Sequence, residues 1–182
     1  MLDAMVAADD REDAPERELH SLAPDELDAW LPLAGVLMRL PAALDAQLQR
    51  DAGISHVEYL VLATLSQAPG RELVMSDLAA RANCSLSRLS QVVSRLERHD
   101  WVRRAPCAHN GRLTRATLTD AGWDKLAATA PGHAKAVRNL VIDPLTTAQI
   151  KHLRGISTRL LNRVNSPLTD TQTDLATTAE TP

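Results

Sequence analysis

Hydrophobic and polar positions follow a helical period most clearly in the middle of the chain. Four apolar side chains recur there at intervals of three and four residues, namely Leu86, Leu89, Val93 and Leu96. Four polar or basic side chains repeat that spacing two residues later, namely Arg88, Gln91, Arg95 and Arg98. At about 3.6 residues per turn, the two sets lie about 200° apart. The pattern predicts a helix over residues 85–98 that packs on one face and carries a basic, amide-bearing row on the other.

This row has the chemistry that DNA recognition requires. Arginine donates to guanine edges or phosphates, and glutamine pairs with adenine. Small side chains that admit the DNA backbone lie on the same segment, namely Ser85, Ser87, Ser90 and Ser94. An ordinary solvated amphipathic helix has the same two-sided pattern, so the segment alone leaves both interpretations open.

The flanking sequence favours DNA recognition. A shorter helix is predicted over about 76–82, and two short strands are predicted at 101–104 and 115–119. The loop between the strands contains Asn110-Gly111, which is typical of hairpin turns. Helix, turn, helix and hairpin together predict a winged helix-turn-helix unit over residues 55–122. In such a unit the second helix, called the recognition helix and here predicted at 85–98, enters the major groove. The hairpin, or wing, contacts the minor groove. The candidate DNA contacts on the wing are His109, Asn110, Arg112 and Arg115.

The sequence resembles the multiple-antibiotic-resistance regulator (MarR) family of bacterial transcription factors. The resemblance rests on Ser-Asp-Leu-Ala at 76–79, on residues 85–98, on the wing and on Leu-Thr-Asp-Ala-Gly at 118–122. The family's wing motif Asp-x-Arg corresponds to Asn110-Gly111-Arg112, its glycine after the recognition helix to Asp100, and its early helix arginine to Gln91. These departures concern base preference rather than the fold. The resemblance covers about residues 25–164 and implies a dimer.

Further helices are predicted on either side of this unit. One spans 25–50 and is expected to bend at Pro41, because proline removes a helix hydrogen bond. Capping boxes at Ser55–Glu58 and Thr146–Gln149 open two more. Thr119 is expected to cap a helix that is interrupted near Pro131-Gly132. The helices at 25–50 and 133–164 carry apolar stripes with no further element to cover them. A two-fold dimer would bury both stripes and would place the recognition helices on a palindrome with half-sites about 10 base pairs apart.

Composition narrows the class of protein. The chain has 45% apolar residues and no Phe, which suits a helical core of Leu, Val and Ala. The sequence predicts one domain at 21–165, between an acidic disordered tail at 1–20 and a second disordered tail at 166–182. The net charge is −3, yet residues 81–115 hold eight arginines against two acids. That basic segment favours a nucleic-acid partner over a winged-helix dimer used for protein contacts only, which is the alternative.

No catalytic motif and no cofactor site is expected, so the chain is predicted not to be an enzyme. Two cysteines, no signal peptide and no apolar run near 18 residues indicate a cytoplasmic protein without a membrane partner. Cys84 begins the recognition helix and Cys107 lies on the wing, so a redox-sensing regulator stays an alternative. Cys107, His109 and His99 do not form a four-ligand metal pattern, and no metal site is predicted.

The resemblance also implies a pocket for a small aromatic or lipophilic effector. Its candidate lining residues are Trp30, Met38, His56 and Tyr59, although core packing explains them equally well. His56 and Tyr59 are three residues apart, on one face of the second predicted helix. The sequence therefore predicts a dimeric DNA-binding transcription regulator, a repressor that such a ligand releases.

Overall fold

The computed structural model describes residues 22–107 and 110–166 of the 182-residue chain, and for residues 110–112 it describes the backbone alone. The predicted tail at 1–20, all of the predicted tail at 166–182 except Ser166, and the candidate His109 therefore lie outside the described residues. The chain divides into two compact units, Met1–Ala130 and Pro131–Pro182. Each unit is described by itself.

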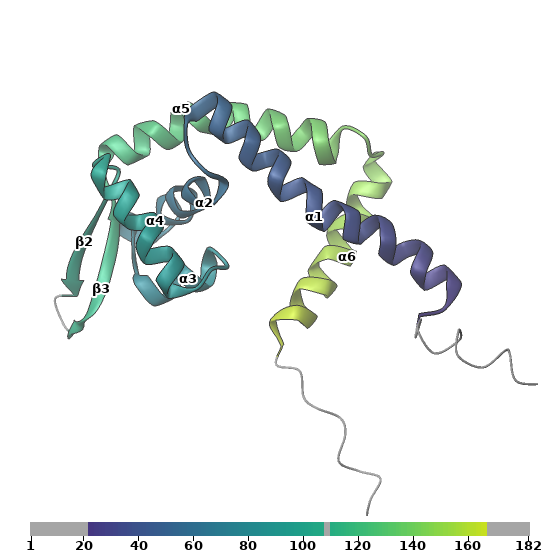
Figure 1. Cartoon of the computed structure of the whole chain (residues 1–182), viewed down its shortest axis with the longest axis horizontal. Coiled ribbons are helices and arrows are strands. Elements are labelled where there is room, and N and C mark those ends of the chain that lie inside the picture. Colours follow the sequence, from purple (N-terminus) through teal and green to yellow (C-terminus); the bar gives the residue numbers. More distant parts are fainter. Residues whose placement is uncertain (1–21, 108–109, 167–182) are drawn as a thin grey trace, which may run out of the picture. The chain divides into compact units, whose positions relative to one another are not determined.

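The first unit contains most of the secondary structure (Figure 1). In chain order its elements are α1 (Pro24–Ala52), α2 (His56–Ser66), a 3₁₀ turn (Pro69–Arg71), β1 (Glu72–Val74), α3 (Met75–Arg81), α4 (Leu86–Arg98), β2 (Val102–Cys107), β3 (Asn110–Leu118) and the larger part of α5 (Asp120–Val137). The three strands form an antiparallel sheet in the order β1-β3-β2. The predicted fold, mainly α with a small β wing in a winged helix-turn-helix, is confirmed.

Side-chain caps begin helices α2, α4 and α5 of this unit. Ser55 Oγ accepts a hydrogen bond from the Glu58 amide at 3.3 Å, and the Glu58 carboxylate accepts one from the Ser55 amide at 2.7 Å. Ser85 Oγ caps α4 by accepting from the Arg88 amide at 3.2 Å. Thr119 Oγ1 caps α5 by accepting from the Gly122 amide at 3.0 Å. These bonds satisfy amides that have no partner inside the helix, and they confirm the predicted caps at Ser55 and Thr119.

Two backbone positions shape the passage from α4 through the wing to α5. Asp100 has φ of 57°, in the left-handed region where glycine is favoured and aspartate is tolerated. At Gly122, a Cβ would lie 2.1 Å from the Trp101 carbonyl oxygen. Only glycine therefore allows the first turn of α5 to pack this closely on the residue that leads into β2.

The core lies between the end of α1, helices α2 to α4 and the sheet. Its largest fully buried side chains are Leu48, Ile54, Val61, Leu62, Leu65, Leu78, Leu89, Val93, Leu96 and Val102. Burying each of the leucines contributes about 1.5–3 kcal/mol. The predicted apolar face of α4 is wrong at one end, because Leu86 is 54% exposed while Val92 is buried. Leu86 lies in the first turn, where it lines a shallow hollow with Val74 and Leu113 instead of entering the core.

The wing is longer than the sequence predicted. Cys107 and Asn110 are Cα partners, so Asn110-Gly111 begins β3 and does not form the turn. Pro106 is accommodated because β2 lies at the edge of the sheet, where a missing amide donor breaks no ladder. The short strand β1, which pairs with residues 115–117 of β3, was not predicted. Three residues are too few for an alternating pattern to stand out in a sequence.

The second unit contains the end of α5, a π-helical turn (Arg138–Ile142) and α6 (Thr147–Asn165). The interruption predicted at Pro131-Gly132 is wrong, because α5 continues through both residues and the α-helical geometry ends only at Val137. The Thr146–Gln149 capping box is confirmed by bonds of 2.8 and 3.3 Å. All of α6 is described, and none of its residues is buried.

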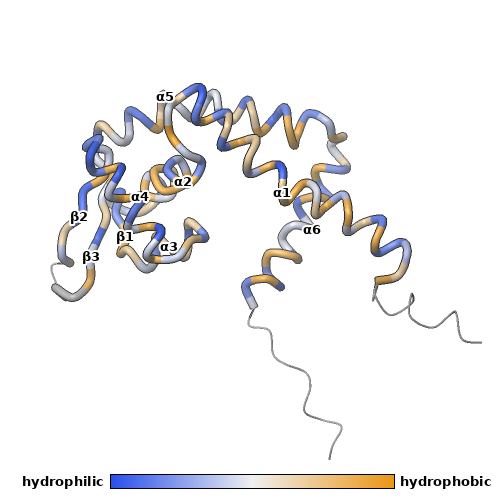
Figure 2. Tube along the Cα trace, viewed as in Figure 1, coloured by the Kyte–Doolittle hydropathy of each residue, from blue (hydrophilic) through white to orange (hydrophobic). Residues whose placement is uncertain are grey.

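Hydrophobic stretches recur along both α1 and α6 (Figure 2). By length and composition α1 could cross a membrane, since one 18-residue window has a mean hydropathy of 1.3 and only 6% of it is buried. No such segment was expected from the sequence. Helices that pack against protein meet the same criterion, so the finding identifies an apolar surface and does not identify what surrounds it. Both prolines inside α1, Pro32 and Pro41, lie within one continuous helix.

Candidate nucleic-acid interface

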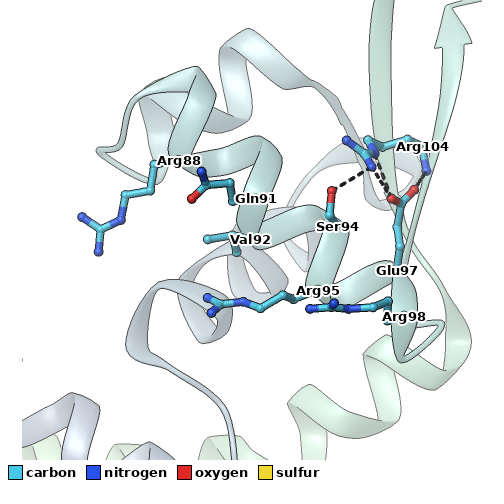
Figure 3. A pocket seen from close by; sticks show the side chains of 8 residues that line it. All are labelled: Arg88, Gln91, Val92, Ser94, Arg95, Glu97, Arg98 and Arg104. Carbon is cyan, nitrogen blue, oxygen red and sulfur yellow. Dashed lines mark hydrogen bonds and ion pairs between the residues drawn. The ribbon is translucent and has the colours of Figure 1, made fainter.

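Helix α4 has the two faces that its sequence predicted. Leu89, Val93 and Leu96 are buried, while Arg88, Gln91 and Arg98 are exposed. Figure 3 shows these polar side chains projecting from α4. Beside them is an open hollow of about 810 Å³. The hollow is lined by Arg88, Gln91, Val92, Ser94, Arg95, Glu97, Arg98 and Arg104.

The charges of this face are only partly compensated. Within the described part of the chain, Arg88 and Arg98 form no ion pair. Arg95 differs, because its Nε lies 3.0 Å from Glu58 Oε1. Glu58 is nearly buried and also caps α2, so Arg95 links α4 to α2 while half of its side chain stays exposed. Unpaired arginines concentrate positive potential on the outward face of α4.

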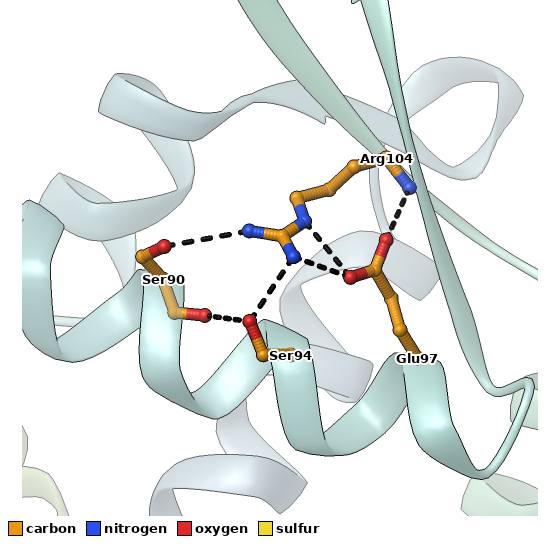
Figure 4. A network of polar contacts seen from close by, with 4 residues as sticks. All are labelled: Ser90, Ser94, Glu97 and Arg104. Carbon is orange, nitrogen blue, oxygen red and sulfur yellow. Dashed lines mark hydrogen bonds and ion pairs between the residues drawn. The ribbon is translucent and has the colours of Figure 1, made fainter.

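Arg104 on β2 also faces this surface and was missed by the sequence reasoning. Its Nε donates to Glu97 Oε2 at 2.9 Å, and its backbone amide donates to Glu97 Oε1 at 3.0 Å. Its Nη2 donates to Ser94 Oγ at 3.0 Å, and its Nη1 donates to Ser90 Oγ at 3.4 Å (Figure 4). The bonds from Arg104 lower the pKa of the Glu97 carboxyl despite partial burial. Ser90 and Ser94, predicted to contact DNA, therefore bond within the protein.

The remaining candidate contacts flank α4. Ser85 and Ser87 are exposed at its start. Arg115 on β3 forms an ion pair with Glu72 on β1. The backbone of Asn110 and Arg112 belongs to β3. The structure therefore leaves Ser85, Ser87, Arg88, Gln91 and Arg98 exposed, and it pairs Arg115 with a carboxylate inside the sheet.

The two cysteines differ in environment. Both are free; Cys84 is half-buried in the turn before α4, and Cys107 is buried. A buried thiol is less accessible to an oxidant, which weakens Cys107 as a redox candidate. His99 stacks on Trp101 with ring centroids 4.5 Å apart. Among the described residues, which exclude His109, no group of three His, Cys, Asp or Glu side chains is placed to hold a metal.

The four candidate effector residues fall into two pairs. His56 and Tyr59 are half-buried on α2, whereas Trp30 and Met38 are exposed on α1. Burial lowers the pKa of His56, although the Asp45 carboxylate opposes this, and burial raises the pKa of Tyr59. Neither the hollow along α4 nor the one beside Leu86 is lined by any of the four. Their role in ligand binding stays a prediction.

Comparison with known proteins identifies the family. Residues 52–113 match the MarR family. The chain is 41% identical to Sco3205, a MarR family transcriptional regulator from Streptomyces coelicolor whose crystal structure is in complex with DNA. That alignment covers 83% of this chain and 94% of Sco3205, with a TM-score of 0.78. The chain belongs to the MarR family.

Two further solved structures share the fold. AbsC, a MarR family transcriptional regulator from Streptomyces coelicolor, is 33% identical over 79% of this chain and 99% of its own, with a TM-score of 0.70. MepR from S. aureus, solved as a DNA complex, is 18% identical over 74% of this chain and 96% of its own, with a TM-score of 0.65, and shows the fold alone. No curated protein matches the chain. As a MarR family member, the chain is a transcription regulator and not an enzyme.

Proposed function

We propose that this MarR family chain is a dimeric, sequence-specific DNA-binding protein that represses transcription and is released from DNA by a small aromatic or lipophilic molecule. One observation carries the DNA-binding part of the proposal. The exposed face of α4 presents Arg88, Gln91 and Arg98 while the opposite face is locked into the core. The DNA-bound crystal structure of Sco3205, which is 41% identical, supports the same partner for this chain.

The side chains of α4 suit different parts of the DNA. With its side chains an α-helix is about 10–12 Å in diameter, which fits a major groove about 12 Å wide. Arg88 and Gln91 have the donors and acceptors for base edges, and Arg98 suits a phosphate. Ser85 and Ser87 lie at the helix N-terminus, where backbone amides favour phosphate. On the wing, Arg112 would enter the minor groove.

The exposed apolar side chains of the terminal helices support the proposed dimer. On α6 they form one stripe, consisting of Leu153, Ile156, Leu160 and Val164, with Leu161 at its edge. On α1 they include Trp30, Leu31, Leu37 and Met38. A second copy related by a two-fold axis covers such stripes with their own equivalents. The two α4 helices would then contact a palindrome with half-sites about 10 base pairs apart.

Release by a ligand requires that the ligand bind the two dimer states differently. A coupling free energy of about 1–3 kcal/mol lowers DNA affinity by about 5- to 150-fold. His56 and Tyr59 are the proposed polar contacts, because they are half-buried polar groups on α2. Trp30 and Met38, which α1 leaves exposed, are the proposed apolar contacts. A DNA partner also implies a cytoplasmic location.

The decisive experiment is fluorescence-anisotropy binding to the intergenic DNA beside the chain's own gene, against a scrambled duplex, at about 50 and 200 mM salt. Selective binding that weakens by about 10³- to 10⁵-fold between these salts is expected if 6–10 phosphates are contacted. A screen of aromatic compounds and oxidants on the bound complex then tests release. A Cys84→Ser variant that loses oxidant-dependent release would favour the redox alternative. Absence of DNA binding at both salts would favour a dimer used for protein contacts only.

A further inference from the structure

An ion pair between Arg104 and Glu97 joins the wing to the recognition helix. Glu97 lies in the last turn of α4 and Arg104 lies in β2, and both side chains are about 30% exposed. Glu97 accepts from the Arg104 guanidinium through Oε2 and from the Arg104 backbone amide through Oε1. The carboxylate thus holds both the side chain and the main chain of the wing strand.

The same guanidinium also orders two hydroxyls on α4. Its Nη2 and Nη1 bond to Ser94 Oγ and Ser90 Oγ, and Ser94 Oγ in turn donates to the Ser90 carbonyl oxygen at 2.9 Å (Figure 4). Charge-assisted bonds from a planar guanidinium fix direction as well as distance. Arg104 therefore spans two turns of α4, from Ser90 to Glu97.

These contacts leave Arg104 poorly suited to hold a phosphate. Its guanidinium already donates to a carboxylate and two hydroxyls, and the neighbouring negative charge of Glu97 would repel a phosphate. The arrangement suits orientation better. Cys107, at the end of β2, lies about 10 Å along the strand from Arg104, so a rotation of about 10° at Arg104 displaces that end by about 2 Å.

We infer that Arg104 and Glu97 form a clamp that sets the angle between the wing and α4, so that the wing and the helix fit the same DNA half-site together. Arg104 is then a positioning residue that determines specificity and does not contact phosphate. The inference rests on the proposed DNA-binding function. It assigns Ser90 and Ser94 to the clamp and leaves Arg88, Gln91 and Arg98 to the DNA.

The test uses the full chain with Arg104→Lys and Glu97→Gln. Lysine keeps the charge but cannot reach Glu97, Ser94 and Ser90 at once, and glutamine has one acceptor oxygen where glutamate has two. Anisotropy should show that Arg104→Lys weakens binding to the intergenic duplex about 10-fold. The affinity for the scrambled duplex and the salt dependence of binding should stay unchanged. Glu97→Gln should also weaken selective binding, although removing an acid beside DNA would by charge alone strengthen it. The double variant should bind no more weakly than the weaker single variant.

Glu72→Gln is the matched control. Glu72 pairs with Arg115 at a similar exposure, and its substitution changes the net charge equally without touching α4. It frees Arg115, a charge that would strengthen binding to both duplexes alike, so the ratio of selective to scrambled binding should stay unchanged. Selective binding by Arg104→Lys at the wild-type level, or tighter binding by Glu97→Gln, would overturn the clamp.

A second measurement does not depend on DNA. Amide hydrogen exchange at Arg104, Ala105 and Cys107 should accelerate in Arg104→Lys and Glu97→Gln but not in Glu72→Gln, because the Arg104 amide donates to Glu97. Unchanged exchange overturns the clamp even if the wild-type chain binds DNA selectively. Wild-type failure to prefer its duplex, with accelerated exchange in both variants, would instead refute the proposed function and retain the clamp.

Discussion

The winged-helix region and the terminal helix α6 bury their apolar residues very differently. Between α2 and β3, every helix contributes fully buried side chains to one core. Helix α6 has five large apolar side chains that are 37–80% exposed, and none of its residues is buried. Both have amphipathic sequences, so the difference lies in what covers the apolar face. The winged-helix region supplies its own cover, whereas the apolar side chains of α6 stay exposed.

This difference separates two roles within one chain. A region that buries its own apolar face can hold a recognition surface rigid in a single copy. A stripe left exposed contributes stability only when it is covered, which makes it suited to assembly. We therefore expect substitutions in the two regions to change different measurements.

The largest effect is expected on α6. Leu160→Glu places a charge in the middle of the apolar stripe, so the dimer should dissociate and DNA affinity should fall by about 10²- to 10⁴-fold as the second half-site is lost. Analytical ultracentrifugation and anisotropy measure the two outcomes. Asn162→Glu, about 180° around the same helix from Leu153, adds the same charge outside the stripe and should change neither. A Leu160→Glu dimer with normal affinity would show that α6 does not form the interface.

In the winged-helix region, stability should follow burial on α4. Leu96→Ala removes a fully buried side chain and should lower the free energy of unfolding by about 2–5 kcal/mol. Leu86→Ala removes the same atoms from a side chain that is 54% exposed and should change it by less than about 1 kcal/mol. Urea denaturation compares the two. Equal losses would mean that Leu86 is covered in the assembled protein.

Substitutions on the outward face of the same helix should change DNA recognition and leave the free energy of unfolding unchanged. Arg88→Ala should weaken binding by about 1–3 kcal/mol and relax the preference at one base position in each half-site. Binding to a set of single-base variants of the duplex measures this. Arg154→Ala removes the same charge from α6 and should relax no position. A uniform loss over all duplexes would reassign Arg88 to a phosphate.

The smallest expected effect is a pH dependence. Arg104 lowers the pKa of Glu97 below its ordinary value of 4.5, so the pair stabilises the folded state fully above that value. The contribution, less than about 1 kcal/mol for a partly exposed pair, is lost as the pH falls through the lowered pKa. Urea denaturation between pH 7 and pH 3 should show that the free energy of unfolding falls less with acid in Glu97→Gln than in wild type. Parallel curves would show that the pair does not contribute to stability.

Local features were predictable from the sequence. The capping box at Ser55–Glu58 is confirmed because its bonds join residues three apart, so short spacing carries the whole signal. The winged-helix fold and the family assignment are also confirmed. They were predictable because the helical periods and the residues after α4 lie within one short stretch. The tails, the effector residues and the DNA contacts stay predictions.

Contacts between distant segments were not predictable. Glu97 and Arg104 are visible in the sequence, but only the return of β2 along α4 brings them together. Arg95 was assigned to DNA from its helical position, yet it pairs with Glu58, 37 positions earlier in the chain. No periodicity encodes such a pairing.

By itself, the sequence determined where the main helices form, which face of α4 is apolar over most of its length, and which family the chain belongs to. These properties depend on residues within one or two helical turns, or on a short contiguous motif. Tertiary structure alone decided that Leu86 stays outside the core, that β1 joins the sheet, and that Arg104 bonds to α4. Each of these depends on which distant surface lies opposite a residue, and folding is what brings that surface there.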